Sequence, residues 1–187
     1  MGATTATSYI SVEEVSSDFN TNMDDERYSL LESSILAAED MIGEYCDRSF
    51  KTAGTADVPV VRSFNVQECD NSLFVGDYVS LTNVEITEDE GVTWTPVEWS
   101  DRPQKRRIDS IKPFNIIVVD ENFPTHIRKD TVRITGILGW SIVPDGVKQA
   151  TRLQAGEIFG LLEEGTGTCA MHPEAKMLLQ NYRSVRF

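Results

Sequence analysis

The sequence contains few of the residues that build metal centres, disulfide frameworks and acid–base catalysts. Among its 187 residues there are only three cysteines and two histidines. Cys46, Cys69 and Cys169 lie far apart and form no Cys-x-x-Cys motif. We therefore expect neither a zinc site nor a set of disulfides, and this cysteine usage favours a reducing compartment. His126 and His172 have no nearby sequence partner for metal binding or acid–base chemistry.

Long apolar runs and a surplus of basic residues are also missing. No segment approaches the ~18 apolar residues that a membrane span needs, and residues 1–11 lack the basic and apolar regions of a signal peptide. Thirty acidic residues against seventeen basic ones give a net charge of −13. Such a surface repels phosphates, so sequence-specific binding to DNA is not expected. It suits either simple solubility or a wall past which DNA slides without sticking.

No motif of a catalytic or cofactor-binding kind is visible in the chain. Residues 165–168, Gly-Thr-Gly-Thr, lack the Gly-Lys-Ser/Thr of a phosphate loop, and residues 88–90 lack the alternating oxygen ligands of a calcium loop. Asp40 and Glu44 share one face of a predicted helix, four residues apart. They could be paired carboxylates of a catalytic site, although a partner cation explains them more simply. We therefore expect a protein without enzymatic activity, cofactor or metal.

A long amphipathic helix is predicted near the start of the chain. Ser11 and Glu14 have the spacing of a capping box, and Asp24 or Asp25 suits the N-terminus of the longer helix that follows. Apolar residues then recur at steps of three and four, which places them on one face. This stripe consists of Tyr28, Leu31, Ile35, Ala38, Ile42 and Tyr45. Further apolar residues widen it, so we expect the helix to be covered by the rest of the domain or by a neighbouring subunit.

The middle of the chain has the two-residue period of β-strands. Strands are predicted at 60–66, 72–75, 79–87, 92–99, 116–119 and 132–137. Residues 88–91 predict a hairpin turn, and Pro96 predicts a sheet edge or a bulge. The segment 101–107 is a basic loop in an acidic protein, and its cations are Lys105, Arg106 and Arg107. This loop suits contact with an acidic patch on a neighbour, or it is merely solvated.

Two further helices are predicted after the β-rich segment. Pro144 suits the first turn of one of them, and Pro173 suits the first turn of the last. Gly156 and Gly160 weaken the first of these helices by ~1 kcal/mol each relative to alanine, so close packing against another backbone is expected there. The chain closes on a basic and aromatic segment, 182–187, whose residue types are common at interface anchors.

The order of these elements predicts an α+β fold. The helical core is a small bundle, with one long N-terminal helix and two C-terminal helices, formed by residues 1–57 and 131–187. An antiparallel β-rich subdomain, residues 58–130, is inserted into it.

Four parts of the sequence resemble the head-to-tail connector proteins, also called adaptor or head-completion proteins, of long-tailed double-stranded DNA bacteriophages. They are the end of the first helix at 42–50, the strand-to-helix junction at 134–150, the helix after it, and the closing segment 178–187. The middle of the chain, about 58–130, matches only as a β-rich insertion of variable size. The resemblance covers both ends of the chain and contains no catalytic signature.

The resemblance implies a virion protein that forms a ring of about twelve copies beneath the portal, connects the head to the tail and extends the DNA channel. Its partners would be other copies of itself, the portal above, a stopper or tail protein below, and DNA that passes without sequence-specific binding. No membrane is implied. The protein would act in the neck of the virion and assemble in the host cytoplasm.

Two sets of residues are candidates for these contacts. The portal-docking arm is predicted to contain Leu178, Tyr182, Arg183, Val185, Arg186 and Phe187. The contact between subunits is predicted to contain Tyr28, Leu31, Ile35, Ile42, Gly156, Gly160, Lys105, Arg106 and Arg107.

Two other functions remain open at the level of the sequence. A tail-terminator or tail-tube-type phage protein is chiefly β and would show more strand than helix. A hydrolase or metal-dependent enzyme would use Asp40, Glu44 and one of the histidines.

Overall fold

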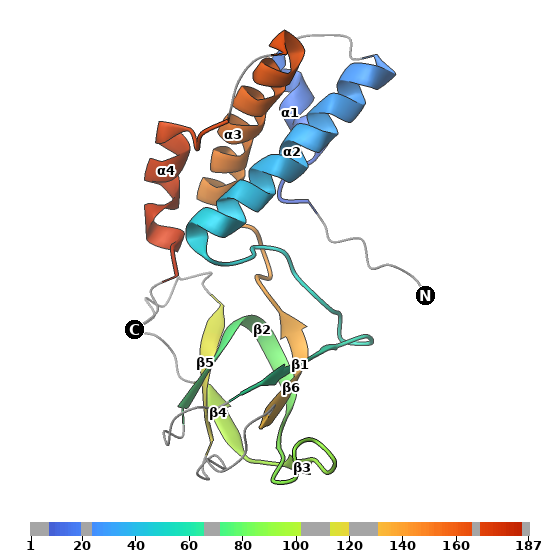
Figure 1. Ribbon diagram of the computed structural model, residues 1–187, viewed down its shortest axis with the longest axis vertical. Helices are drawn as coiled ribbons and strands as arrows, with labels where there is room; N and C mark the ends of the chain where they lie inside the picture. Colours follow the sequence, from blue (N-terminus) through green and yellow to red (C-terminus); the bar gives the residue numbers. More distant parts are fainter. Residues whose placement is uncertain are drawn as a thin grey trace. The chain divides into compact units, whose positions relative to one another are not determined.

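The chain folds into two compact units, each with its own core (Figure 1). The computed structural model describes residues 8–19, 24–65, 72–101, 113–119, 131–165 and 169–184. The sheet unit is formed by residues 52–142, and the helical unit by residues 7–51 and 143–187. Helices and an antiparallel sheet therefore coexist in one chain, and the predicted α+β class is confirmed.

The helical unit contains four α-helices and two short 3-10 turns in its described part. They are α1 (Val12–Ser16), η1 (Ser17–Phe19), α2 (Asp25–Cys46), α3 (Asp145–Glu164), α4 (Pro173–Leu179) and η2 (Gln180–Tyr182). Within this unit α3 packs against α2 on one flank and against α4 on the other (Figure 1). The core between α1, α2 and α3 contains Ile10, Val15, Leu31, Ile35, Ala38, Ala155, Ile158 and Phe159.

Local sequence signals fix where these helices begin. The Ser11 side chain accepts a hydrogen bond from the backbone N–H of Glu14, and the Glu14 carboxylate accepts one from the backbone N–H of Ser11, which is the predicted capping box. The Asp24 carboxylate accepts from the backbone N–H of Arg27 at 2.8 Å and caps α2. These contacts satisfy backbone donors that a helix leaves open at its first turn.

The sheet unit is built on antiparallel pairing. Its strands are β1 (Val60–Phe64), β2 (Ser72–Ile86), β3 (Thr95–Pro96), β4 (Trp99–Asp101), β5 (Phe114–Val119) and β6 (Val132–Leu138). The order across the sheet is β1-β6-β2-β5-β4, and β3 pairs with β2. β6 alternates strictly between buried and half-buried residues, as expected for a strand with one face on a core.

The long strand β2 differs from its predicted form. The sequence predicted two strands, 72–75 and 79–87, with a break between them, but the structure has one strand of 15 residues. Gly76 adopts a φ of +78°, and the pairing with β5 shifts register between Phe74 and Tyr78. An irregular position inside a strand bends it without ending it. β2 pairs with β5 both before and after Gly76, and with β6 from Tyr78 onward.

The boundaries between the two units also differ from the predicted ones. The prediction placed them after residue 57 and before residue 131, and the structure places them after residues 51 and 142. β6 pairs with β1 and β2, so residues 132–138 belong to the sheet unit. The backbone of Ala53 exchanges two hydrogen bonds with that of Leu138, both at 2.9 Å, and this adds residues 52–57 to the same unit. None of the helices in the described part of the chain is long and apolar enough to cross a membrane.

Candidate functional site

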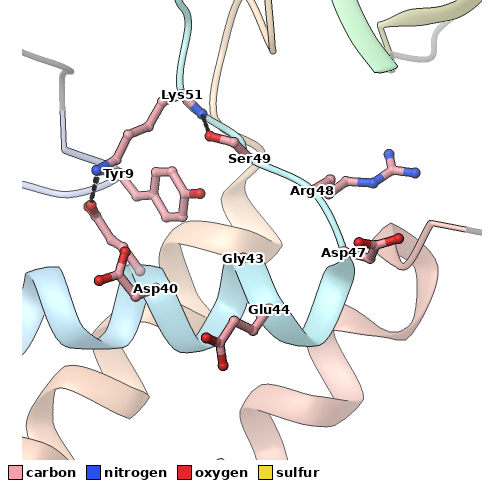
Figure 2. Close-up of a pocket in the computed structure, with 9 residues that line it drawn as sticks. Tyr9, Asp40, Gly43, Glu44, Asp47, Arg48, Ser49 and Lys51 are labelled. Atoms are coloured by element: carbon pink, nitrogen blue, oxygen red, sulfur yellow. Dashed lines mark hydrogen bonds and ion pairs between the residues drawn. The ribbon is translucent and has the colours of Figure 1, made fainter. Parts of the chain in front are cut away.

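A hollow of about 620 Å³ lies along the C-terminal half of α2 in the helical unit (Figure 2). Helix α2 forms one wall and the segment 47–51, which follows it, forms another. The residues that line the hollow are Tyr9, Glu39, Asp40, Gly43, Glu44, Asp47, Arg48, Ser49 and Lys51. Its rim is thus strongly charged, with acidic side chains from α2 and basic ones from the following segment.

A buried ion pair holds one end of the hollow together. The Glu39 side chain is only 1% exposed, and one of its carboxylate oxygens lies 2.8 Å from the Lys51 ammonium. The other oxygen accepts hydrogen bonds from the Ser8 hydroxyl and from the backbone N–H of Tyr9. The phenol oxygen of Tyr9 in turn accepts from the backbone N–H of Phe50 at 3.0 Å. Glu39 therefore fixes the N-terminal segment against α2, which is a structural role.

The Tyr9 ring completes this arrangement. The Lys51 ammonium lies 5.7 Å from the centre of the ring, within the range of a cation–π contact. The Phe50 ring meets Tyr9 edge to face, with the ring centres 5.8 Å apart. Burial raises the pKa of the Tyr9 phenol, so this group stays neutral and serves as a hydrogen-bond acceptor.

Asp40 and Glu44, the predicted carboxylate pair, lie on the outer side of α2 and are exposed (Figure 2). Within the described part of the chain, no ion pair joins either carboxylate to a cation. The partner cation predicted for them is therefore not found among these residues. His172 serves as the N-cap of α4, where its Nδ1 accepts from the backbone N–H of Glu174 at 3.2 Å. His126 lies outside the described residues.

No group of three or more potential metal ligands occurs in the part of the chain that the structure describes. Cys46 is fully buried at the end of α2, and burial raises the pKa of its thiol to about 11. A protonated buried thiol is a poor nucleophile and a poor metal ligand. The hollow thus offers charge and shape, without the paired base and nucleophile that catalysis requires.

The predicted contact between subunits needs a correction at three positions. Leu31, Ile35 and Ile42 are at most 2% exposed, because α2 turns this stripe toward the core of its own unit. They are core residues and cannot meet a neighbouring subunit. Tyr28, at the start of the stripe, is 40% exposed, and its hydroxyl donates to the Glu13 carboxylate at 2.9 Å.

An exposed apolar residue outside the predicted contact set lies on the opposite side of α2. Leu36 is 49% exposed. Because each residue of a helix advances by about 100°, Leu36 points away from its neighbour Ile35 in the buried stripe. Leu36 lies in an apolar run between Ile35 and Ala37, so composition alone does not distinguish it from the core residues. Only its helical angle separates it from the core.

The helical glycines are less crowded than their predicted packing role requires. A Cβ added to Gly160 would meet no described atom within 4 Å, so no other backbone among the described residues approaches it. Gly156 is partly exposed. The predicted basic contact residues, Lys105, Arg106 and Arg107, lie outside the described residues.

The start of the predicted docking arm is held on its own helical unit. The Tyr182 ring packs edge to face against Phe50, with 6.0 Å between the ring centres, and it lies over Gly146, where a Cβ would be 3.1 Å away. The Arg183 guanidinium lies 5.1 Å from the centre of the Tyr45 ring. The backbone N–H of Ser184 donates to the Cys46 carbonyl at 2.8 Å. Val185, Arg186 and Phe187 lie outside the described residues.

The outer face of α4 remains exposed. Met177 is 69% exposed and is the most exposed large apolar side chain of the helical unit among the described residues. Lys176 and Leu178, its neighbours, are also exposed, while Ala175 and Leu179 are buried toward α3. Helix α4 therefore presents a short surface with exposed apolar side chains, one cation and one carboxylate, that of Glu174.

Solved structures share this architecture over its whole length. A chain from the neck of an empty gene transfer agent (GTA) particle, computed with C6 symmetry, matches with a TM-score of 0.64 and 20% identity. The match covers 100% of this chain and 96% of that one. A chain from the neck of a native particle, computed with C12 symmetry, matches with a TM-score of 0.59 and 19% identity, over 100% and 94% of the two chains. The chain has the neck fold.

The neck fold confirms, at the level of architecture, the resemblance to connector proteins that the sequence predicted. No protein-family model matches the chain, and no curated protein matches it. The neck fold comprises both units of this chain, so the β-rich insertion, which the sequence matched only by its composition, belongs to the shared architecture.

Proposed function

We propose that the protein is a structural subunit of a phage-type neck, which forms a ring beneath the portal, connects the head to the tail and extends the DNA channel. The observation that carries this proposal is the match of the whole chain to neck chains in particles computed with C6 and C12 symmetry. A match that extends over both units supports a shared role more strongly than a match to one unit would, because necks are assembled from the entire subunit.

The chemistry of the chain supports a role without catalysis. The charged hollow holds a buried ion pair and exposed carboxylates, and the described histidine caps a helix. A net charge of −13 suits the wall of a channel, since acidic side chains repel the phosphates of passing DNA. DNA would thus be conducted through the ring without sequence-specific contacts, and no cofactor or metal is required.

The partners in this proposal are about twelve copies of the chain itself, a portal above, and a stopper or tail protein below. The protein would assemble in the host cytoplasm and act in the neck of the virion. A tail-terminator or tail-tube role is less well supported, because such proteins are chiefly β and this chain has helices of 22 and 20 residues.

The end of the chain is the proposed portal-docking arm. Its anchor is the contact of Tyr182, Arg183 and Ser184 with the end of α2, which sets the place from which the following residues leave the helical unit. Residues 185–187, Val-Arg-Phe, would then meet the portal with one guanidinium and one aromatic ring.

Electron microscopy of the protein mixed with the portal of the same particle tests the proposal. We expect a ring on one end of the portal and a continuous central channel. A variant that lacks residues 185–187 should keep its circular dichroism spectrum and lose attachment to the portal. The matched control is Leu162→Ala, which changes an exposed apolar residue on α3, outside the arm. Normal attachment of the shortened chain would rule out this docking segment, and the absence of any ring would rule out the neck role.

A further inference from the structure

The outer side of α2 presents one apolar and two acidic side chains in a row. Leu36, Asp40 and Glu44 are spaced four residues apart, so they follow one another along the exposed face of the helix. All three are exposed, although Leu36 is a large apolar residue. We call these three residues the α2 strip. The charged hollow begins beside it, at Asp40 and Glu44.

The hollow beside the α2 strip has room for a long side chain. Gly43 lies between Asp40 and Glu44, and its lack of a side chain leaves the space above this part of the helix open (Figure 2). A Cβ at Gly43 would contact the Arg48 carbonyl at 3.5 Å, so a larger residue would begin to fill the hollow. Gly43 is thus one of the residues that keep this part of the hollow open.

The outer face of α4 carries one exposed cation, Lys176, and one exposed carboxylate, Glu174. Lys176 and Met177 are exposed next to each other on this helix, and Met177 points away from the buried residues Ala175 and Leu179. We call Lys176 and Met177 the α4 knob. Helix α3 lies between α2 and α4, so the α2 strip and the α4 knob lie on different flanks of the helical unit (Figure 1).

We infer that the α2 strip of one subunit binds the α4 knob of a second copy of this chain. In this contact Met177 packs on Leu36, and the Lys176 ammonium reaches Asp40 and Glu44 at the rim of the hollow. The inference rests on the proposed ring, and it specifies which surfaces close that ring. The match between the Lys176 ammonium and two exposed carboxylates carries it, together with one exposed apolar residue on each surface.

Such a contact is of the kind that builds rings. It joins two different surfaces, so each copy uses its α2 strip toward one neighbour and its α4 knob toward the other. Contacts between two identical surfaces would stop at a dimer. The apolar pair supplies burial, and the charges select the partner and the register, because like charges placed opposite one another are strongly disfavoured at interfaces.

Two charge-reversed variants test this contact. In the strip variant, Asp40→Lys and Glu44→Lys, both surfaces are basic. In the knob variant, Lys176→Glu, both surfaces are acidic. Each variant alone should fail to form rings, on its own or on the portal. An equal mixture of the two should form rings again, because the basic strip of one variant meets the acidic knob of the other in alternation.

The matched control is Glu157→Lys, which reverses one exposed charge on α3 and should leave rings unchanged. All changed residues are exposed, and circular dichroism confirms that each variant is folded. A second measurement uses the unaltered protein. A carbodiimide joins amines and carboxylates in direct contact, and a mixture of 15N-labelled and unlabelled chains should yield a mixed crosslink from Lys176 to Asp40 or Glu44.

The outcomes distinguish a failure of the contact between the α2 strip and the α4 knob from a failure of the proposed neck role. If the unaltered protein forms rings and the reversed variants form them equally well, the contact lies elsewhere and the inference is overturned, while the proposed function stands. Rings from the unaltered protein without restoration by the mixture would also overturn it. If the unaltered protein forms no ring, alone or with the portal, the proposed function fails and the inference fails with it.

Discussion

The two units of this chain reach stability by different means. In the sheet unit, backbone pairing brings strands so close that one position must be glycine. A Cβ at Gly136 would lie 2.3 Å from the Ser80 carbonyl oxygen and 2.8 Å from the Leu81 Cα. In the helical unit, side chains determine the contacts, and a Cβ at Gly160 would meet nothing described. The sheet unit therefore has little tolerance at its strand contacts, whereas the helical unit keeps open surface that a partner can use.

The buried charges show the same difference. Glu39 and Lys51 in the helical unit form a pair whose carboxylate is 1% exposed. Glu85 and Arg133 in the sheet unit pair at 2.8 Å, with side chains that are 13% and 31% exposed, and the Arg133 guanidinium lies 4.3 Å from the centre of the Trp94 ring. The Glu39 carboxylate is thus shut off from solvent, whereas the Glu85 carboxylate is partly exposed. Both cations are partly exposed, Lys51 at 25%.

The units can be followed separately in solution. All three tryptophans, Trp94, Trp99 and Trp140, belong to the sheet unit, so tryptophan fluorescence reports on that unit alone. Circular dichroism at the helical minimum reports chiefly on α2 and α3, which are the longest helices described. Each prediction below uses these two signals to test the difference between the units.

The largest expected effect is the loss of the buried Glu39 carboxylate. Glu39→Ala leaves the Lys51 ammonium without its partner and removes the acceptor of the Ser8 hydroxyl and the Tyr9 amide. Lys51 is 25% exposed and water can reach it, so most of the cost, about 3 kcal/mol, comes from the Ser8 hydroxyl and the buried Tyr9 amide, which lose their acceptor. Chemical denaturation followed by circular dichroism should show this loss. The matched change, Glu85→Ala, should cost about 1 kcal/mol or less, because solvent already screens that pair. Equal effects of both changes would contradict the assigned difference in burial.

The next effect concerns the crowded glycine of the sheet. Gly136→Ala places a methyl group where Ser80 and Leu81 already lie, so β2 and β6 must move apart. Overpacking of this kind costs about 2 kcal/mol. The loss should appear in denaturation followed by tryptophan fluorescence. A variant as stable as the original protein would show that the strands yield without cost.

The open glycine of α3 should respond with the opposite sign. Gly160→Ala adds a methyl group in free space and raises helix propensity, which stabilises the helical unit by about 1 kcal/mol. Denaturation followed by circular dichroism should shift to higher denaturant, with tryptophan fluorescence less affected. If Gly160 contacts another subunit in a ring, the same variant should be stabilised as a monomer and impaired in assembly.

The smallest effect is a pH dependence confined to the sheet unit. The Asp89 carboxylate accepts hydrogen bonds from the Thr93 hydroxyl, the Thr93 amide and the Thr87 hydroxyl, which together lower its pKa to about 2. The carboxylate thus contributes stability above the unfolded pKa of about 4, and this contribution is lost as the pH falls toward 2. In the Asp89→Asn variant, the stability measured by tryptophan fluorescence should fall less between about pH 4 and pH 2 than in the original protein. An unchanged pH dependence would assign the effect to other carboxylates.

Much of the local structure was predictable from the sequence. The cap of α1 by Ser11, the start of α2 after Asp24 and the start of α4 at Pro173 each follow from short-range hydrogen bonds or backbone geometry. The alternation of β6 followed from the period of its side chains. These features depend on residues close in sequence, which is why pattern and spacing were sufficient.

The features that were predicted wrongly or not at all depend on residues that are far apart in the sequence. Leu31 and Ile35 were predicted to lie in the contact between subunits, although α3 of the same chain covers them. Glu39 was not predicted to be buried. Its burial depends on Ser8 and Tyr9, which precede α2 in the sequence, and on Lys51, which follows it. Local spacing cannot reveal such convergence, since no periodic pattern marks it.

The contact between Ser184 and the end of α2 also makes Cys46 a chemical reporter. Its thiol is fully buried, its pKa is about 11, and its own carbonyl accepts the Ser184 amide. Alkylating reagents react with thiolates, so they should leave Cys46 unmodified in the native protein. An anchor that stays in place should keep this protection when the portal binds. A faster alkylation, read by mass spectrometry of the Cys46 peptide, would show that the end of α2 opens on docking.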